Sequence, residues 1–76
     1  MSRYRKYWAS QLAESEQAIN LYKEAFNLVN NETIEIQSSR LSEEADKIKV
    51  IFKAGNNYYT AYLILNDDQI ADLEVE

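Results

Sequence analysis

The sequence predicts an α+β fold in which one long N-terminal helix packs across a four-stranded antiparallel meander sheet. Three observations lead to this prediction. Apolar residues recur every three or four positions as far as residue 29, they alternate every second position from residue 33 onward, and short runs of Asn, Asp and Gly separate the alternating segments. All 76 residues are expected to form a single domain, 1–76.

The helix is expected over residues 3–30. Ser15 fills the one gap in its apolar stripe, which is otherwise Tyr4, Trp8, Leu12, Ile19, Tyr22, Phe26 and Val29. A second apolar row broadens the face that a sheet would cover: Ala18, Leu21, Ala25 and Leu28. Asn30 and Asn31 tolerate the left-handed conformation that ends helices, so the helix is predicted to stop near residue 30.

The strands are expected over residues 33–37, 47–54, 58–65 and 69–75, with a polar loop over 38–46. The segments 55–57 (Gly-Asn-Asn) and 66–68 (Asn-Asp-Asp) tolerate positive φ and predict tight hairpin turns. An order of one helix followed by four strands resembles the cystatin-like class of folds. This likeness is one of architecture and implies no functional residue.

The composition argues against the common catalytic chemistries. The chain has no Cys and no His, which removes thiolate nucleophiles, disulfides and the usual general base. No spacing pairs a nucleophile with a base, and the single Gly lies in a predicted turn outside any phosphate-binding loop. We therefore expect a protein that is not an enzyme, with no cofactor and no metal.

Size and charge point to a macromolecular partner. A core of this size rarely supplies more than about 3 to 5 kcal/mol, so a homodimer or larger homo-oligomer is expected. The net charge of −5 lies entirely in residues 41–76, which hold three basic and eight acidic side chains. No segment has the length or apolar character to span a membrane or direct secretion, and a cytoplasmic protein is expected, in the host cytoplasm if it is phage-encoded.

The sheet face away from the helix is the first candidate site. If Ala61, Leu63 and Leu65 face the helix, Tyr58, Thr60, Tyr62 and Ile64 face outward, and neighbouring strands add Ile51 and Ile70. Exposed aromatic and apolar area on a small protein usually marks an interface, with nearby acids as an electrostatic guide. The predicted protein-binding residues are Ile51, Tyr58, Tyr62, Ile64, Asp67, Asp68 and Asp72.

Two other sites stay open. The basic aromatic segment Arg3, Tyr4, Arg5 and Lys6 could contact nucleic acid or an acidic partner. Alternatively, its rings continue the helical stripe into the core, or the helix begins near Ser10 and leaves this segment outside. A third alternative is a small-molecule pocket between helix and sheet, lined by Trp8, Tyr22 and Phe26.

The function expected from these features is that of a small protein-binding protein that occludes or bridges its partner. Inhibition of a host or defence protein by a phage or mobile element suits such a chain, as does an immunity- or antitoxin-like role. Nucleic-acid binding through the N-terminal segment is the alternative from another class.

Overall fold

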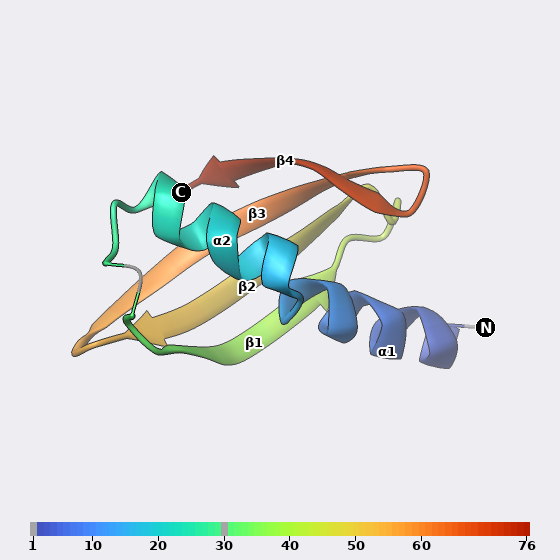
Figure 1. Ribbon diagram of the computed structural model, residues 1–76. Coiled ribbons are helices and arrows are strands. Elements are labelled where there is room, and N and C mark those ends of the chain that lie inside the picture. The colour runs from blue at the N-terminus through green and yellow to red at the C-terminus, as the bar shows by residue number, and fades with distance from the viewer. Residues whose placement is uncertain (1, 30) are drawn as a thin grey trace.

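The fold combines two helices with one antiparallel sheet (Figure 1). The computed structural model describes the backbone of residues 2–29 and 31–76 and the side chains of residues 7–29 and 31–76. Its elements, in chain order, are α1 (Ser2–Ala13), α2 (Glu16–Ala25), β1 (Ile34–Leu41), β2 (Lys47–Ala54), β3 (Asn57–Asn66) and β4 (Gln69–Val75). Adjacent strands pair antiparallel in the order β1-β2-β3-β4. The predicted α+β class and the four-stranded meander are confirmed.

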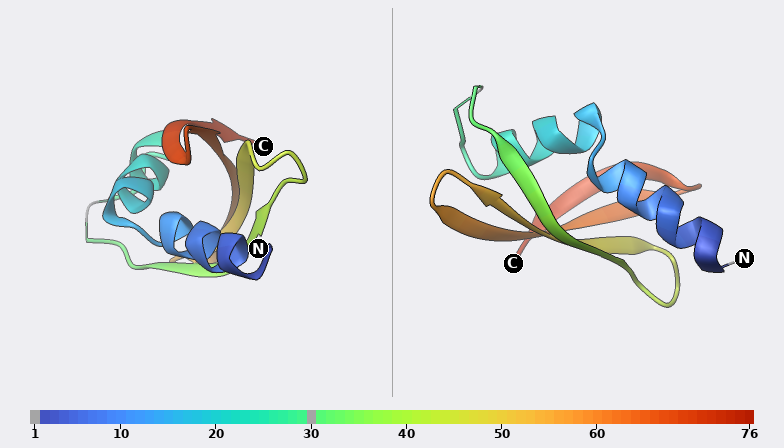
Figure 2. Two further views of the ribbon diagram at one scale, coloured as in Figure 1. Left: turned by 90° about the vertical axis from the view of Figure 1, so that its right-hand side faces the viewer. Right: turned by 90° about the horizontal axis from the view of Figure 1, so that it is seen from below.

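Both helices lie on the same face of the sheet, and the sheet curves around them (Figure 2). α1 packs mainly on β1, and α2 packs on β4. The opposite face of the sheet is therefore convex, and no helix of the described residues covers it.

The expectation of one long helix over residues 3–30 is wrong, because the chain breaks at Glu14 and Ser15. Ser15 has an extended backbone and acts as the N-cap of α2, where its Oγ accepts a hydrogen bond from the Ala18 N–H at 3.2 Å. The same hydroxyl donates to the carbonyl of Leu12 at 2.7 Å, in the last turn of α1. One serine thus ends one helix and starts the next. Since α1 begins at Ser2, a helix start near Ser10 is also wrong.

The second helix ends earlier than predicted, at Ala25 rather than near residue 30. Asn27 takes the left-handed conformation, with φ of 56°. Its N–H donates to the carbonyl of Glu24, and the N–H of Leu28 donates to the carbonyl of Lys23. This pair of hydrogen bonds is the Schellman arrangement that closes helix C-termini.

The first strand extends through residues that the sequence predicts to be a loop. β1 continues from Ile34 to Leu41, past the predicted limit at residue 37. The register against β2 shifts between Ile36 and Ser38, which leaves Gln37 as an extra residue in a β-bulge. The bulge shifts the alternation of buried and exposed positions by one residue. Even-numbered Ile36 faces the core before the bulge, and odd-numbered Leu41 faces the core after it.

The two hairpin turns of the sheet lie where they are predicted. Gly55 has a φ of +62°, a conformation that favours glycine; a Cβ there would also lie 2.7 Å from Oε1 of Glu32, but that flexible side chain can move aside. Asp67 and Asp68 both have positive φ, 53° and 63°, the pattern of a type I′ turn between β3 and β4.

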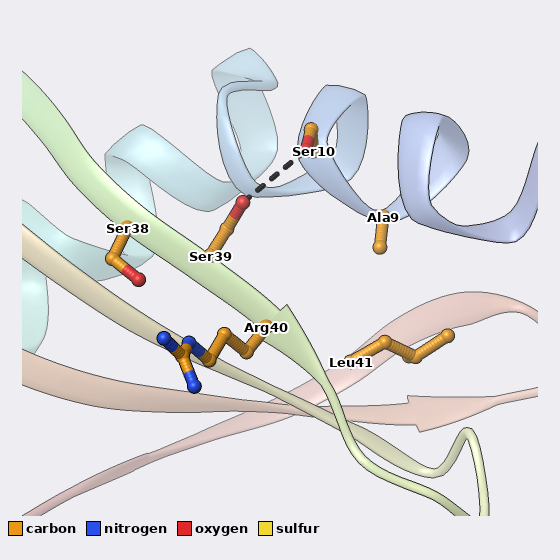
Figure 3. A pocket seen from close by; sticks show the side chains of 6 residues that line it. All are labelled: Ala9, Ser10, Ser38, Ser39, Arg40 and Leu41. Atoms are coloured by element: carbon orange, nitrogen blue, oxygen red, sulfur yellow. Dashed lines mark hydrogen bonds between the residues drawn. The ribbon is translucent and has the colours of Figure 1, made fainter. Parts of the chain in front are cut away.

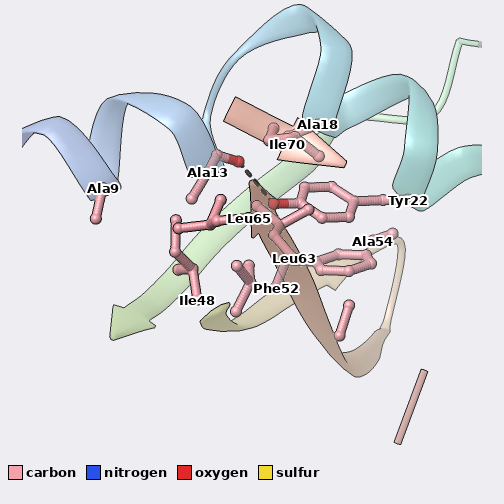
Figure 4. Close-up of a cluster of buried hydrophobic side chains, with 12 residues drawn as sticks. Ala9, Ala13, Ala18, Tyr22, Ile48, Phe52, Ala54, Leu63, Leu65 and Ile70 are labelled. Carbon is pink, nitrogen blue, oxygen red and sulfur yellow. Dashed lines mark hydrogen bonds between the residues drawn. The ribbon is translucent and has the colours of Figure 1, made fainter. Parts of the chain in front are cut away.

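Alanines on the helices and large side chains on the central strands form the core (Figure 4). The helices bury Ala9, Ala13, Ala18 and Tyr22, so small side chains let them approach the sheet closely. Val29, which the predicted stripe includes, is 61% exposed because it lies beyond the end of α2. The buried strand residues are Ile48, Val50, Phe52, Ala54, Ala61, Leu63, Leu65 and Ile70.

Candidate functional site

The convex side of the sheet carries a continuous surface, which we call the open face. Residues paired across antiparallel strands project their side chains to the same side, and these residues alternate with the buried ones. The open face consists of Glu35, Ser38 and Arg40 on β1, Lys47, Lys49, Ile51 and Lys53 on β2, Tyr58, Thr60, Tyr62 and Ile64 on β3, and Asp72 and Glu74 on β4.

The strand register arranges these side chains in rows that cross the sheet. Arg40 pairs with Lys49, Lys49 with Tyr62, and Tyr62 with Glu74, so one row runs across all four strands. In the adjacent row Ile64 lies between Lys47 and Asp72. These two rows pass from a cation on the β1–β2 side, through an aromatic or aliphatic side chain, to a carboxylate on β4. The rows nearer the β2–β3 turn differ, because Ser38 pairs with Ile51 and the acid Glu35 pairs with Lys53.

Along these two rows the open face is polarised in charge from β1 and β2 to β4, while Glu35 adds one acid to the β1 edge beside Lys53. Among the side chains that the structure describes, no acid lies within ion-pair distance of Arg40 or Lys49, and no base lies within that distance of Glu74. The other two lysines of β2 lie over tyrosine rings of β3. Lys47 Nζ is 5.9 Å from the centroid of Tyr62, and Lys53 Nζ is 5.8 Å from that of Tyr58. The cations thus border the aromatic centre of the face without neutralising the acids on β4.

Tyr62 links the centre of the face to its acidic side. Its hydroxyl donates a hydrogen bond to Oε1 of Glu76 at 2.8 Å. This hydrogen bond, with smaller contributions from desolvation and from the charge of Glu76, raises the pKa of Tyr62 above its ordinary value. The phenol therefore holds its proton towards Glu76, which fixes the orientation of the hydroxyl and leaves its oxygen as an acceptor for a partner.

The predicted apolar members of the face differ in how much surface they offer. Tyr58 is 65% exposed near the β2–β3 turn, whereas Ile51, Tyr62 and Ile64 are half-buried by neighbouring side chains. Ile70, expected on this face, is instead buried in the core, because the register shift in the β3–β4 pairing places it opposite Leu65. The apolar centre consequently comes from β2 and β3 alone.

The structure divides the predicted acids between two places. Asp72 lies on the open face opposite Ile64, where its Oδ1 accepts the N–H of Leu73 at 2.8 Å. Asp67 and Asp68 occupy the β3–β4 turn, at the opposite end of β3 from Tyr58. The turn acids can guide an approaching cation along the sheet but do not border the whole face.

Arg40, Lys49 and Glu74 belong to the open face although the sequence analysis did not select them. Arg40 falls in the segment predicted to be a loop, and Figure 3 shows its side chain leaving β1 on the side away from Ser39 and α1. Lys49 and its neighbours Lys47 and Lys53 do show a signal in the sequence, since they alternate with buried Ile48, Val50 and Phe52. The carboxylate of Glu74 can be placed beside Tyr62 only once the register is known.

The N-terminal basic segment gives no site geometry. The side chains of Arg3, Tyr4, Arg5 and Lys6 lie outside the described residues, although their backbone belongs to α1. Tyr7, the first described side chain, is 67% exposed on the same helix.

A hollow of about 620 Å³ between α1 and β1 is lined by small and polar side chains (Figure 3). Ser10 Oγ and Ser39 Oγ lie 3.3 Å apart within it, and among the side chains of residues 7–29 and 31–76 Arg40 is its one ionisable lining residue. The hollow therefore brings together no acid and base for catalysis. In the described part of the chain, no three acidic side chains converge as potential metal ligands.

The rings of the predicted small-molecule pocket are used in packing. Tyr22 is fully buried and stacks on Phe52, with centroids 4.7 Å apart. Phe26 contacts Phe52 edge-on at 5.6 Å and Tyr59 at 4.9 Å. Trp8 is half-buried against the same core. These rings fill the space between helix and sheet where the pocket is expected.

Two further findings bear on what the chain could be. Neither described helix is both apolar and long enough to span the hydrocarbon core of a bilayer. Comparison with known proteins found no matching family model, no matching curated protein and no matching solved structure. The open face is thus the feature of the molecule from which a function can be inferred.

Proposed function

We propose that this protein functions by binding another protein on the open face of its sheet, without catalysing a reaction of its own. The observation that supports this most strongly is the composition of that face. Tyr62, Ile51 and Ile64 form an aromatic and aliphatic centre between a basic border and an acidic border, on the side that no described helix covers.

Such a surface suits recognition of a folded protein. Tyrosine and arginine are enriched in the cores of protein interfaces, because they combine a large contact area with hydrogen bonding. Opposite charges on the two borders fix the orientation of a partner and speed its association. The convex shape also suits a broad contact better than enclosure of a small molecule.

Nucleic acid fits this face less well than protein does. The lysines of β2 and the exposed ring of Tyr58 could contact phosphates and bases. However, Asp72 and Glu74 lie two strands away on the same face, and the chain carries a net charge of −5. Both would repel a polyanion laid across the sheet.

The mode of action proposed is steric: the bound protein either covers a working surface of its partner or bridges two partners. A chain of 76 residues without Cys or His has little besides its surface with which to act. Inhibition of a host or defence protein by a phage or mobile element is the context that we favour. An immunity- or antitoxin-like role uses the same kind of contact.

Substitution of Tyr62 tests this proposal. We expect Tyr62→Asp to abolish capture of the partner by tagged protein from extracts of the cells that naturally produce it, since an unpaired carboxylate would be placed at the centre of the face. Tyr7→Asp makes the same change on exposed α1 and serves as the matched control. Captured proteins are compared by quantitative mass spectrometry, and circular dichroism verifies that each variant is folded.

The two variants distinguish binding by the open face from binding by the N-terminal segment. Loss of the same captured protein with Tyr62→Asp and its retention with Tyr7→Asp would support the proposal. Retention with Tyr62→Asp and loss with Tyr7→Asp would instead assign binding to the N-terminal part of α1.

A further inference from the structure

The open face has the charge pattern of a surface that complements itself. We propose that it binds a second copy of this chain, with the two sheets packed face to face about a two-fold axis that runs parallel to the strands between β2 and β3. This inference rests on the proposed function, since it names a second copy as a protein that the open face binds, and any other protein partner of that face must displace the second copy.

The direction of that axis decides which strands of the two copies face each other. In a two-fold dimer of stacked sheets, the axis lies in the plane between them. An axis parallel to the strands places the β1–β2 side of one copy over the β3–β4 side of the other. An axis perpendicular to the strands places β1 over β1 and β4 over β4. The first arrangement opposes Arg40 to the acids of β4, and the second opposes the lysines of β2 to each other and the acids of β4 to each other.

The row that crosses all four strands shows this complementarity residue by residue. With the axis parallel to the strands, Arg40 faces Glu74 of the second copy, and Lys49 faces the ring of Tyr62 of the second copy. Two-fold symmetry repeats both contacts. The contact of Lys49 with Tyr62 lies near the axis, whereas Arg40 and Glu74 lie on the edge strands of a convex sheet and must meet through their long side chains.

The isolated chain leaves these groups available. Within the described residues, Arg40, Lys49 and Glu74 form no ion pair, so dimerisation would not need to break one. The centre of the contact would remove Ile51, Ile64 and Tyr62 from water, and desolvation there strengthens the flanking charge pairs relative to fully exposed ones.

The size and shape of the face limit the area of such a contact. The molecule measures 36 × 21 × 20 Å along its principal axes, and the sheet extends along the longest of them (Figure 1). Because two convex faces meet over only part of that side, we expect each partner to bury less than the area of about 800 Å² of a standard stable interface, and the dimer to be correspondingly weak. Small domains without disulfides or metals also commonly gain stability by association.

Reciprocal charge reversal tests the pairing of Arg40 with Glu74 of the second copy. Sedimentation velocity is recorded on the purified full chain from about 1 to 300 μM. We expect the wild type to reach twice the monomer mass. Arg40→Glu and Glu74→Lys should each raise the dissociation constant at least about tenfold, because each places two like-charged pairs in the dimer. An equimolar mixture of the two variants should recover the wild-type dissociation constant, since both pairs in the mixed dimer then have opposite charges.

Glu24→Lys is the control for Glu74→Lys, because it makes the same change in net charge on the exposed surface of α2. Dimerisation unaffected by this variant supports the assignment to the open face. Failure of the mixture to associate, or an equal loss with Glu24→Lys, would overturn it.

The remaining outcomes separate this inference from the proposed function. A wild type that stays monomeric throughout overturns the dimer, while loss of a captured protein with Tyr62→Asp would still support binding by the open face. A dimer that neither Tyr62→Asp nor Glu74→Lys weakens forms through another surface and overturns this inference, while the capture experiment with Tyr62→Asp still decides the proposed function. A monomer that instead co-sediments with a single-stranded oligonucleotide at low salt overturns the dimer in favour of nucleic-acid binding.

Discussion

Tyr22 connects the two helices and the sheet through a single side chain. Its ring stacks on Phe52 of β2, and its hydroxyl donates a hydrogen bond to the carbonyl of Ala13 at 2.8 Å. That carbonyl ends α1 and has no partner within its own helix, so the phenol satisfies a buried acceptor. Burial, and secondarily the charge of Glu14, raises the pKa of Tyr22 well above its ordinary value near 10.

Removal of this hydroxyl should destabilise the fold in a pH-dependent way. Tyr22→Phe is expected to lower the free energy of unfolding by about 1 to 2 kcal/mol at pH 7, since Ala13 then loses its partner. The neutral phenol is favoured in the folded state, so its contribution is complete below pH 10 and declines as the pH rises above that value. Urea unfolding at pH 7 and pH 11 should therefore show a smaller difference between wild type and variant at pH 11. An equal difference at both values would contradict this account.

The break between the helices shapes the molecule at the scale of its elements. Because Ser15 separates them, α1 can follow β1 while α2 turns to lie along β4, and both remain on the concave side of the curved sheet (Figure 2). A single straight helix would cross the sheet in one direction and leave part of that side uncovered. The capping serine therefore determines how the concave side is filled.

Loss of this cap should weaken the helical layer. Ser15→Ala is expected to lower the free energy of unfolding by about 1 kcal/mol, because the Ala18 N–H loses its acceptor. Ser15→Asp restores an accepting oxygen and should lose less. Asn20→Ala, on the exposed side of α2, should be close to neutral. Urea titrations of the wild type and the three variants measure these free energies of unfolding. A Ser15→Ala variant as stable as the wild type would show that the cap does not stabilise the break between the helices.

The sequence predicts element types well where the periodicity is uninterrupted, and poorly where it changes phase. β2 spans Lys47–Ala54 as expected, since its alternation continues throughout. β1 is longer than expected because the bulge at Gln37 shifts the buried positions by one residue, and the remaining segment then has no continuous pattern. The register shift beside Ile70 has the same effect in β4. Such shifts depend on strand pairing, which local sequence does not encode.

The charge asymmetry of the whole molecule runs across the sheet more clearly than along the chain. The sequence places the excess of acid in residues 41–76. The fold nevertheless brings Lys47, Lys49 and Lys53 from that half beside Arg40 from the other half, and it separates them from Glu74 by the width of a strand. The alternation in the sequence could predict the tyrosines and isoleucines of the open face. The complementary borders follow only from the register.

Cysteine labelling measures directly whether the open face is covered by a partner. The chain has no Cys, so Ile51→Cys on the open face and Asn20→Cys on α2 each introduce a single reactive thiol. Maleimide labelling rates are compared in dilute purified protein, in concentrated protein and in extract of the producing cells. We predict that residue 51 is protected in the concentrated protein or the extract relative to the dilute protein, while residue 20 labels equally in all three. Equal labelling of residue 51 under all three conditions, with protection of residue 20, would show that the partner covers α2 and not the open face.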